Sequence, residues 1–235
     1  MQVYDFLTEY LKTEFEAVKQ LHSGLRGTVT LERHRGSGNL YVFRSFTGSA
    51  EVYRRLTGLA CPNLPRIYEA AERDGKAAVL EEYIQGDTVF ELLKGSLFSA
   101  AETRSVITDV CRALSVLHSL GAVHRDIKPE NVILRSGGGA VLIDFDASRT
   151  VKEGGSSDTT VLGTTGFAAP EQYGIGQSDA RADIYALGTL INVMLTGRHP
   201  SVEMAPGRFG RIVKKCTMVN PDDRYKDITR LMEAL

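Results

Sequence analysis

One short polar run constrains this chain more than any other part of its sequence. The run reads HRDIKPEN at residues 124–131, and it is followed by IDFD at residues 143–146. Asp144 follows Asp126 by 18 residues, and the intervening stretch is apolar and β-branched on either side of three glycines at 137–139. Such a pattern predicts two short strands joined by a turn. A fold for this chain must therefore include a hairpin that returns Asp144 to the neighbourhood of Asp126.

The side chains that this hairpin would bring together are those that phosphoryl transfer requires. The reaction needs a carboxylate to accept the proton of the incoming hydroxyl, a cation beside the transferring phosphate, and oxygen ligands for magnesium. Asp126 is the candidate base and Lys128 the candidate cation. Asn131 and Asp144 are the candidate metal ligands.

The two segments resemble the catalytic loop H-R-D-x-K-x-x-N and the metal-binding motif D-F-G of eukaryotic-type (Hanks-type) Ser/Thr protein kinases, in a compact form like that of some bacterial kinases. The first motif matches in full, whereas Asp146 stands where the family usually has glycine. The resemblance implies an α+β, bilobal protein-kinase-like fold in which residues 1–235 form a single domain. We expect a small, antiparallel β-rich N-lobe over 1–84, a hinge over 82–87 and a mainly helical C-lobe over 88–235.

Residues 163–171, which read GTTGFAAPE, resemble the end of a protein-kinase activation segment. Small-molecule kinases of the aminoglycoside and choline type share a catalytic Asp and Asn but lack this long segment, so its presence favours a protein substrate. By the resemblance, Thr164 would hydrogen-bond the side chains of Asp126 and Lys128. Asp183 would brace the backbone of the catalytic loop.

The same resemblance implies a buried ion pair between Glu171 and Arg224, which would support the fold and take no part in the reaction. It also implies that Arg125 can pair with a phosphorylated residue on a nearby loop. Thr159 and Thr160, in a stretch rich in Gly, Ser and Thr, are the first candidates for that modification. A loop of this composition that carries no phosphate is the alternative.

The N-terminal part departs further from the family. Residues 22–29 resemble the glycine-rich loop G-x-G-x-x-G-x-V, with His22 in place of the first glycine. Two glycines three positions apart often form only a hairpin. Because Gly24 and Gly27 stand between two strands and ahead of the other motifs, we expect backbone amides there to cover the phosphates.

Arg44 occupies the position of the lysine in the family's V-A-I-K strand. Arginine keeps the positive charge but presents a bulky planar fork in place of a compact ammonium. Glu51 is the candidate for the helix carboxylate that pairs with this cation, although it follows Arg44 by only seven residues. This spacing implies an unusually short helix, and an exposed Glu51 without a partner is the alternative.

Residues 79–84, which read VLEEYI, resemble the kinase hinge. The backbone of Glu82 and Ile84 would recognise adenine, and Glu81 would occupy the gatekeeper position. A buried carboxylate requires a cation or hydrogen-bond donors, and Arg44 is a candidate partner. The adenine would be sandwiched by apolar side chains, namely Leu21, Val29 and Val42 on one side and Ile133 on the other.

Apolar periodicity predicts the elements around these motifs. The predicted helices cover residues 3–14, 50–59, 89–93, 100–120, 183–195, 208–218 and 227–234. The predicted strands cover 18–21, 28–33, 40–46, 66–71 and 77–83, followed by the hairpin of 131–134 with 140–143. Residues 85–87 are expected to be a linker. The shortened region between Leu195 and Arg208 leaves room for little more than a turn where the family usually has a docking helix.

The bulk properties narrow the class of protein. The formal net charge is −1, which argues against a general electrostatic role on nucleic acid or an anionic membrane. The three cysteines are not spaced as metal ligands, so we expect free thiols in a reducing compartment. The N-terminus lacks a secretory leader, and no apolar run is long enough to span a bilayer. We therefore expect a cytoplasmic chain, and the composition leaves its oligomeric state open.

These observations predict ATP-dependent phosphorylation of Ser or Thr in proteins, including the chain's own activation loop. ATP and Mg²⁺ are the expected cofactors, with Mn²⁺ as an alternative to Mg²⁺. The competing hypothesis is a nucleotide-binding pseudokinase that acts as a scaffold or an allosteric partner. Asp126, Lys128, Asn131 and Asp144 favour the enzyme, whereas Arg44, Asp146 and the short helix at Glu51 favour the pseudokinase.

Overall fold

The computed structural model describes residues 3–25, 27–150, 166–173 and 178–235. Contacts between Cα atoms divide the chain into two compact units, Met1–Ile84 and Gln85–Leu235. Three positions singled out from the sequence, Thr159, Thr160 and Thr164, lie outside the described residues.

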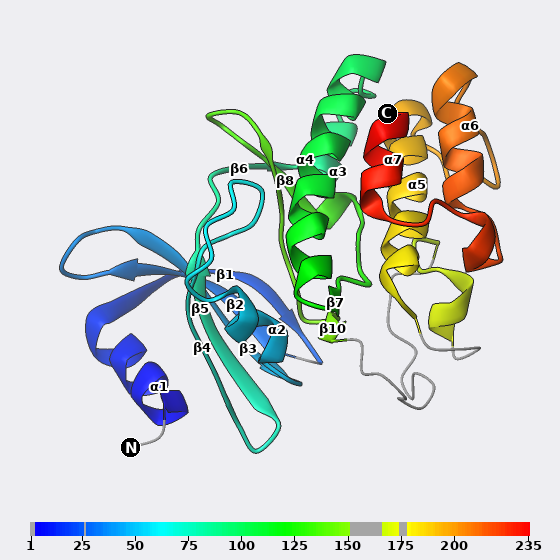
Figure 1. Cartoon of the computed structure of the whole chain (residues 1–235). Coiled ribbons are helices and arrows are strands. Elements are labelled where there is room, and N and C mark those ends of the chain that lie inside the picture. The colour runs from blue at the N-terminus through cyan, green and yellow to red at the C-terminus, as the bar shows by residue number, and fades with distance from the viewer. Residues whose placement is uncertain (1–2, 26, 151–165, 174–177) are drawn as a thin grey trace. The chain divides into compact units, whose positions relative to one another are not determined.

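The first unit is built on one five-stranded antiparallel sheet with the strand order β1-β2-β3-β5-β4. Its elements are α1 (Val3–Glu14), β1 (Phe15–Gly24), β2 (Gly27–His34), β3 (Leu40–Thr47), α2 (Glu51–Leu56), β4 (Ile67–Arg73) and β5 (Lys76–Glu82), as labelled in Figure 1. Every strand and helix predicted for this unit is present. The helix predicted over 50–59 is shorter than expected, because α2 ends at Leu56.

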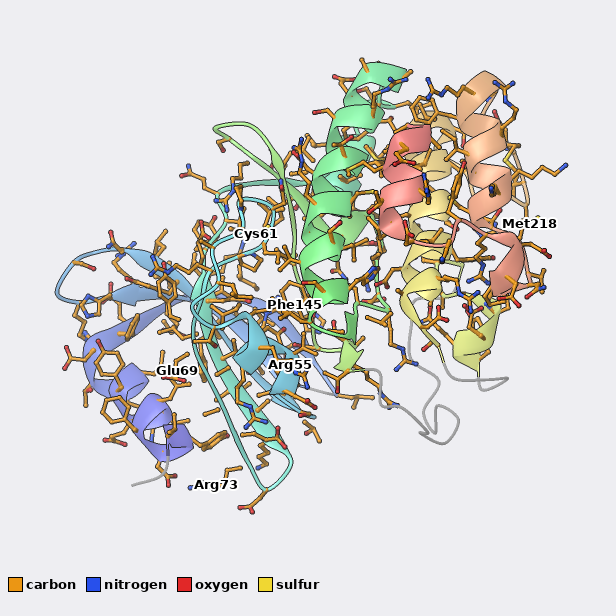
Figure 2. All side chains as sticks on the ribbon, in the orientation of Figure 1. Arg55, Cys61, Glu69, Arg73, Phe145 and Met218 are labelled. Atoms are coloured by element: carbon orange, nitrogen blue, oxygen red, sulfur yellow. The ribbon has the colours of Figure 1, made fainter. Side chains whose placement is uncertain are left out.

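Both faces of the sheet are covered. Side chains alternate between the two faces of a strand, and one face of β5 packs Ala78 and Leu80 against Leu7 and Leu11 of α1. On the other face, Phe46 of β3 meets Tyr53 of α2, with ring centroids 5.8 Å apart. At the edge, Arg73 of β4, labelled in Figure 2, hydrogen-bonds Asp5 of α1. Helix α1 is therefore an integral layer of this unit.

In its described residues, the second unit is mainly helical and contains two small sheets. Its α-helices and strands are β6 (Gly86–Thr88), α3 (Val89–Leu93), α4 (Ala100–Ser119), β7 (Ala122–Val123), β8 (Val132–Arg135), β9 (Ala140–Leu142), β10 (Arg149–Thr150), α5 (Ala180–Thr196), α6 (Gly207–Cys216) and α7 (Ile228–Ala234). The prediction of a linker over 85–87 was wrong in part, because Gly86–Thr88 forms strand β6, which pairs with β8. A Cβ on Gly86 would lie 2.0 Å from the carbonyl oxygen of Leu134, so the pairing requires glycine.

Helix α5 is the centre of this unit. Most of its side chains are fully buried, including those of Ile184, Leu187, Leu190 and Ile191. Helices α4 and α6 run alongside it, and α7 packs against α4 (Figure 1). A helix that is largely apolar on all sides has to be surrounded by other elements in this way.

Capping boxes start two of the described helices, with Thr88 and Glu91 at α3 and Ser99 and Glu102 at α4.

Asn192 organises the short connection between α5 and α6. Its side chain is fully buried, and its Nδ2 donates to the carbonyl oxygens of Arg198 at 2.8 Å and Glu203 at 2.7 Å. Its Oδ1 accepts from the backbone N–H of Ala205 at 2.8 Å. One amide on α5 thereby satisfies the backbone of a segment that lacks regular structure. The region predicted to be shortened is a turn over residues 197–206 held in this way.

Asn192→Ala should lower the free energy of unfolding by about 3 kcal/mol, because it leaves several buried backbone groups without partners. Chemical denaturation monitored by circular dichroism measures this loss. Asn220→Ala is the matched control, since Asn220 is exposed and its side chain accepts one backbone hydrogen bond, from Asp222. The control should cost about 1 kcal/mol or less. Equal losses in the two variants would contradict the role given to Asn192.

Within the described residues, the structure contains no helix that is both long enough and apolar enough to cross a membrane.

Candidate active site

The polar run at 124–131 forms the loop between β7 and β8 of the second unit. Strands β8 and β9 pair antiparallel with Val132 opposite Leu142. The N–H of Ile143 then donates to the carbonyl oxygen of Asn131 at 2.9 Å. The hairpin predicted from the sequence is present and returns the segment 143–146 to the loop.

Three side chains of the loop form one hydrogen-bonded group. The Nζ of Lys128 donates to Oδ2 of Asp126 at 2.7 Å. The Nδ2 of Asn131 donates to the same oxygen at 3.1 Å and to the carbonyl oxygen of Asp126 at 2.8 Å. The Asp126 side chain keeps 15% of its surface exposed, so a carboxylate held by two donors still reaches solvent.

The donor set fits a divalent cation of the magnesium type. Because Nδ2 of Asn131 faces Asp126, Oδ1 is the opposite end of that amide and offers an oxygen ligand. The carboxylate of Asp144 offers a second, and hard cations such as Mg²⁺ prefer oxygen ligands. Mg²⁺ is usually held by one or two side chains of this kind together with phosphate oxygens and water.

His124 ties the loop to the segment that carries Asp144. The fully buried imidazole donates from Nε2 to the carbonyl oxygen of Ile143 at 3.2 Å, and its Nδ1 accepts from the N–H of Asp126 at 3.3 Å. These partners fix the tautomer with the proton on Nε2. The ring of Phe145, labelled in Figure 2, packs edge-on against it at 5.4 Å between centroids.

Two non-glycine residues of the site adopt positive φ, Arg125 at 70° and Asp144 at 70°. Such conformations cost free energy and persist where the surroundings fix them. Asp146, at the position that is glycine in the motif, is not among the described residues with positive φ. Its N–H donates to Oδ1 of Asp144 at 3.3 Å. The Asp146 substitution is therefore compatible with this backbone, and the conformation that favours glycine falls on Asp144 instead.

Asp183, in the first turn of α5, binds the backbone of the loop through hydrogen bonds. Its carboxylate is fully buried and accepts from the N–H groups of His124 at 2.9 Å and Arg125 at 2.8 Å. The Nε2 of His118 on α4 donates to it at 2.8 Å. Burial by itself would raise the pKa of Asp183, but the hydrogen bond and charge of His118, with His124 and the Arg125 N–H, outweigh it and lower the pKa.

The segment after residue 165 is anchored to the same loop. The Nε2 of Gln172 donates to the carbonyl oxygen of Arg125 at 2.9 Å, and its Oε1 accepts from the N–H of Ala169 at 3.0 Å. The expected ion pair of Glu171 with Arg224 is present as two parallel hydrogen bonds of 2.7 and 2.8 Å. This bidentate geometry fixes the end of the segment to the helical core.

In the first unit, Gly24 and Gly27 end β1 and begin β2, where they lie opposite each other. A Cβ on Gly27 would lie 2.1 Å from the carbonyl oxygen of Ser45 on β3. Glycine at 27 is thus required by the packing of the sheet, whatever else the turn does. A Cβ on Gly24 would meet chiefly the His22 ring, whose Nε2 lies 2.9 Å away. This ring is the end of a side chain that can move.

Arg44 and Glu81 form a buried ion pair on the sheet of the first unit. The Nε of Arg44 donates to Oε1 of Glu81 at 2.6 Å, and the two side chains are 6% and 3% exposed. Glu51, at the first turn of α2, accepts at Oε1 from Nη2 of Arg55 at 2.7 Å. Arg55 lies on the exterior of that helix and is labelled in Figure 2. Glu51 therefore has a partner, and Glu81 is bonded to Arg44.

Comparison with known families decides the class. Residues 15–231 match the model of the protein kinase domain. This chain belongs to the protein kinase family. The match begins after α1, which is an additional layer ahead of the family's common region.

The kinase resembles several bacterial Ser/Thr kinases. It is 31% identical to Serine/threonine-protein kinase D of Synechocystis sp. over 195 residues, which cover 73% of this chain and 38% of the relative. It is 30% identical to PknL of Mycobacterium tuberculosis over 219 residues, covering 82% of this chain and 54% of the relative. It is 34% identical to PknJ of Mycobacterium tuberculosis over 185 residues, covering 76% and 31%. The chain thus spans roughly a third to a half of the length of these relatives.

Membership of the family implies the use of ATP and a divalent metal. The kinase departs from the family pattern at two positions where the structure shows the local accommodation, Arg44 with its partner Glu81 and Asp146 with its N–H on Asp144. In both cases the residue that departs from the family pattern makes a hydrogen bond to a neighbour in the structure.

Sequence reasoning missed His118 and Gln172, which support the site, and Asn192, which supports the turn between α5 and α6. His118 follows Leu117 on the apolar face of α4, where its periodicity indicated only packing. Gln172 comes directly after the segment that was recognised, and Asn192 lies within an otherwise apolar helix. A polar residue on an apolar helical face was the one signal available, because burial of such a group demands a partner.

The pKa of Asp183 yields a pH-dependent prediction for the folded kinase. Because the folded pKa lies below the unfolded value, the carboxylate contributes its full stability above about pH 4 and loses it as the pH falls through the folded pKa. Asp183→Asn should lower the free energy of unfolding by about 3–5 kcal/mol at neutral pH. The difference from the parent should shrink below about pH 4. Urea unfolding of both proteins across this range measures it, and a constant difference would count against the assignment.

The ion pair of Arg44 with Glu81 yields a second prediction. Arg44→Met should destabilise the first unit by about 3–5 kcal/mol, because it leaves a buried carboxylate without its cation. The double variant Arg44→Met/Glu81→Leu should recover most of that loss, since it removes both charges. Thermal or urea unfolding of the single and double variants tests this. A double variant less stable than the single one would show that burial of the carboxylate is compensated elsewhere.

Proposed function

We propose that this chain transfers the γ-phosphate of ATP to Ser or Thr hydroxyls of proteins, including its own activation loop. The observation that carries the proposal is the group formed by Asp126, Lys128 and Asn131, in which one carboxylate is held by two donors and still exposed. Residues 1–235 would act as one kinase domain, with the two compact units as its lobes.

Asp126 would accept the proton of the substrate hydroxyl through a carboxylate oxygen. Lys128, 2.7 Å from that carboxylate, would keep it oriented and place a positive charge beside the γ-phosphate. Asn131 and Asp144 would hold Mg²⁺, or Mn²⁺ in its place, through oxygen. When bound, the metal neutralises charge on the phosphate oxygens. The support for these roles is the hydrogen-bonded geometry of the loop and its buried brace, Asp183.

The first unit would supply the nucleotide contacts. Backbone amides near Gly24 and Gly27 would cover the phosphates, and Arg44 would bind them as the cation of β3. The N–H of Glu82 already donates to the carbonyl oxygen of Arg66 at 2.9 Å, so the Glu82 carbonyl would be its group for adenine, with the backbone of Ile84. Apolar contacts to the base would come from Leu21, Val29 and Val42 of this unit and from Ile133 of the second unit.

Thr159 and Thr160 would accept phosphate in the activation loop, with Arg125 as the cation that pairs with it. Thr164 would hydrogen-bond Asp126 and Lys128. The support is the anchoring of the segment beyond residue 165 to the backbone of Arg125 through Gln172. The negative charge of a phosphate added to that loop would therefore act close to the proposed catalytic base, Asp126.

The proposal includes a protein as substrate and the cytoplasm as the site of action. The chain's three cysteines, Cys61, Cys111 and Cys216, are unpaired, which is typical of a reducing compartment. Burial raises the pKa of Cys111 to about 12 and also raises that of Cys216, so neither thiol is suited to a reactive role.

Asp126→Asn tests the proposal. Incubation of the parent with ATP and Mg²⁺ should place phosphate on Thr159 or Thr160, as read by mass spectrometry of intact protein and peptides. The variant should be slower by about 10²–10⁴-fold, because it cannot accept the proton. Asp223→Asn, an exposed acid of the same unit, is the control and should retain the parent's rate.

Two outcomes would turn against the enzyme. A parent that binds ATP but phosphorylates neither itself nor a general protein substrate would favour the pseudokinase scaffold. A rate equal in the parent and Asp126→Asn would show that the phosphate comes from a contaminating kinase. Circular dichroism of each variant establishes that the fold is retained.

A further inference from the structure

A histidine in the turn between α5 and α6 reaches the segment after residue 165, which is anchored to the catalytic loop. The Nε2 of His199 lies 2.9 Å from the carbonyl oxygen of Gly166, 33 residues earlier in the chain. The ring also packs against this glycine, since a Cβ on Gly166 would lie 3.8 Å from Cδ2 of His199. The described part of the segment begins at Gly166, so the turn holds it at that end.

The other side of the ring fixes the role of Nε2. The Nδ1 of His199 accepts from the backbone N–H of Ser201 at 3.2 Å, and the Ser201 hydroxyl lies 2.7 Å from the same nitrogen. A ring nitrogen that accepts carries no proton, so the proton of the neutral ring is on Nε2. Nε2 therefore donates to the carbonyl oxygen of Gly166, and the two ring nitrogens link the turn to the segment.

The turn that carries His199 is itself fixed to the helical core. The carbonyl oxygen of Arg198 accepts from the buried amide of Asn192 on α5 at 2.8 Å. The same amide donates to the carbonyl oxygen of Glu203 at 2.7 Å. The carbonyl oxygen of His199 accepts from the N–H groups of Val202 and Glu203 at 2.9 and 3.2 Å. Because the backbone around His199 is held from α5, the core of the unit places its ring.

The segment that begins at Gly166 is tied to the neighbourhood of the proposed base. Gln172 binds the backbone of Arg125, the residue before Asp126. A protein substrate continues on both sides of the hydroxyl that reaches Asp126, so the residues next to that hydroxyl come near the segment. Thr164, the proposed partner of Asp126, is two residues before Gly166 in the sequence. A bond that fixes Gly166 therefore fixes backbone beside which the protein substrate would lie.

We propose that His199 is a positioning residue for the protein substrate, and that it acts by fixing the carbonyl group of Gly166. The inference rests on the proposed function, in which Asp126 receives a hydroxyl of a protein. The short connection between α5 and α6 then serves substrate binding through one side chain. The consequence is an effect on the KM for the protein substrate that is absent from the KM for ATP.

Three substitutions of His199 separate its two contacts. His199→Ala removes both, His199→Gln keeps a donor within reach of Gly166, and His199→Asn keeps an acceptor within reach of the Ser201 N–H. The KM for dephosphorylated casein should rise roughly fivefold or more in His199→Ala and His199→Asn, the size expected for loss of one hydrogen bond. It should stay within about twofold of the parent in His199→Gln. The KM for ATP should be the same in the parent and all three variants.

His34→Ala is the matched control. In a turn of the first unit, Nδ1 of His34 accepts from the N–H of Ser37 at 3.1 Å and lies 3.0 Å from the Ser37 hydroxyl. These are the two contacts that Nδ1 of His199 makes with Ser201. Loss of such a turn contact should leave the KM for casein unchanged. Circular dichroism and chemical denaturation of every variant establish that the fold is retained.

An unchanged KM for casein in a folded His199→Ala overturns the inference. A parental KM in His199→Asn also overturns it, because the contact within the turn would then be sufficient. Equal rises in the KM for casein and the KM for ATP count against it as well, since such an effect is not confined to the protein substrate. If His199→Ala does not fold, His199→Asn and His199→Gln decide by the same comparison.

The proposed function and the inference fail in different ways. A parent that phosphorylates neither casein nor itself removes the proposed function. A parent that phosphorylates only itself is assayed with its Asp126→Asn variant as the substrate, because that chain carries the same loop and is itself nearly inactive. The three His199 variants should then rank as they do with casein, and any other ranking removes the inference alone.

Discussion

The second unit depends on one buried carboxylate. Asp183 lies in the first turn of the central helix α5, and its oxygens accept from the backbone of His124 and Arg125 and from the side chain of His118. Three donors compensate the loss of water around the charge, which burial alone would make unfavourable. The polar loop is thereby tied to a helix most of whose residues are buried. The positive φ of Arg125 is held at the point where these bonds converge.

The first unit solves the same problem with a different pair. Glu81 would be a costly residue in the middle of a sheet, and Arg44 in the adjacent strand supplies its counter-charge at 2.6 Å. In both units a buried acid is therefore explained by its donors. The two acids act on different groups. Asp183 accepts hydrogen bonds from backbone N–H groups of the loop, whereas Glu81 accepts one from the side chain of Arg44. Neither acid is among the residues proposed to contact the transferring phosphate.

Much of the fold could be predicted because local patterns and tertiary structure agree. Alternating residues gave the strands, apolar periodicity gave the helices, and the glycines at 137–139 located the hairpin. The errors lie where long-range contacts decide. Strand β6 has only three residues and exists because β8 offers it a partner. Helix α2 ends at Leu56, earlier than its pattern indicated. The partner of His118 is 65 residues away in the sequence, and the partner of Gln172 at Arg125 is 47 residues away. The partner of Asn192 at Ala205 is 13 residues away.

The sequence by itself determined the chemistry, since the order of Asp126, Lys128, Asn131 and Asp144 allows few reactions other than phosphoryl transfer. It also raised Glu81 as one of two candidate partners for Arg44. Only the tertiary structure decided that Glu81 is hydrogen-bonded to it, because strand register places these residues diagonally on one face. Register is set by how every strand of the sheet packs, and a single segment of sequence does not contain that information.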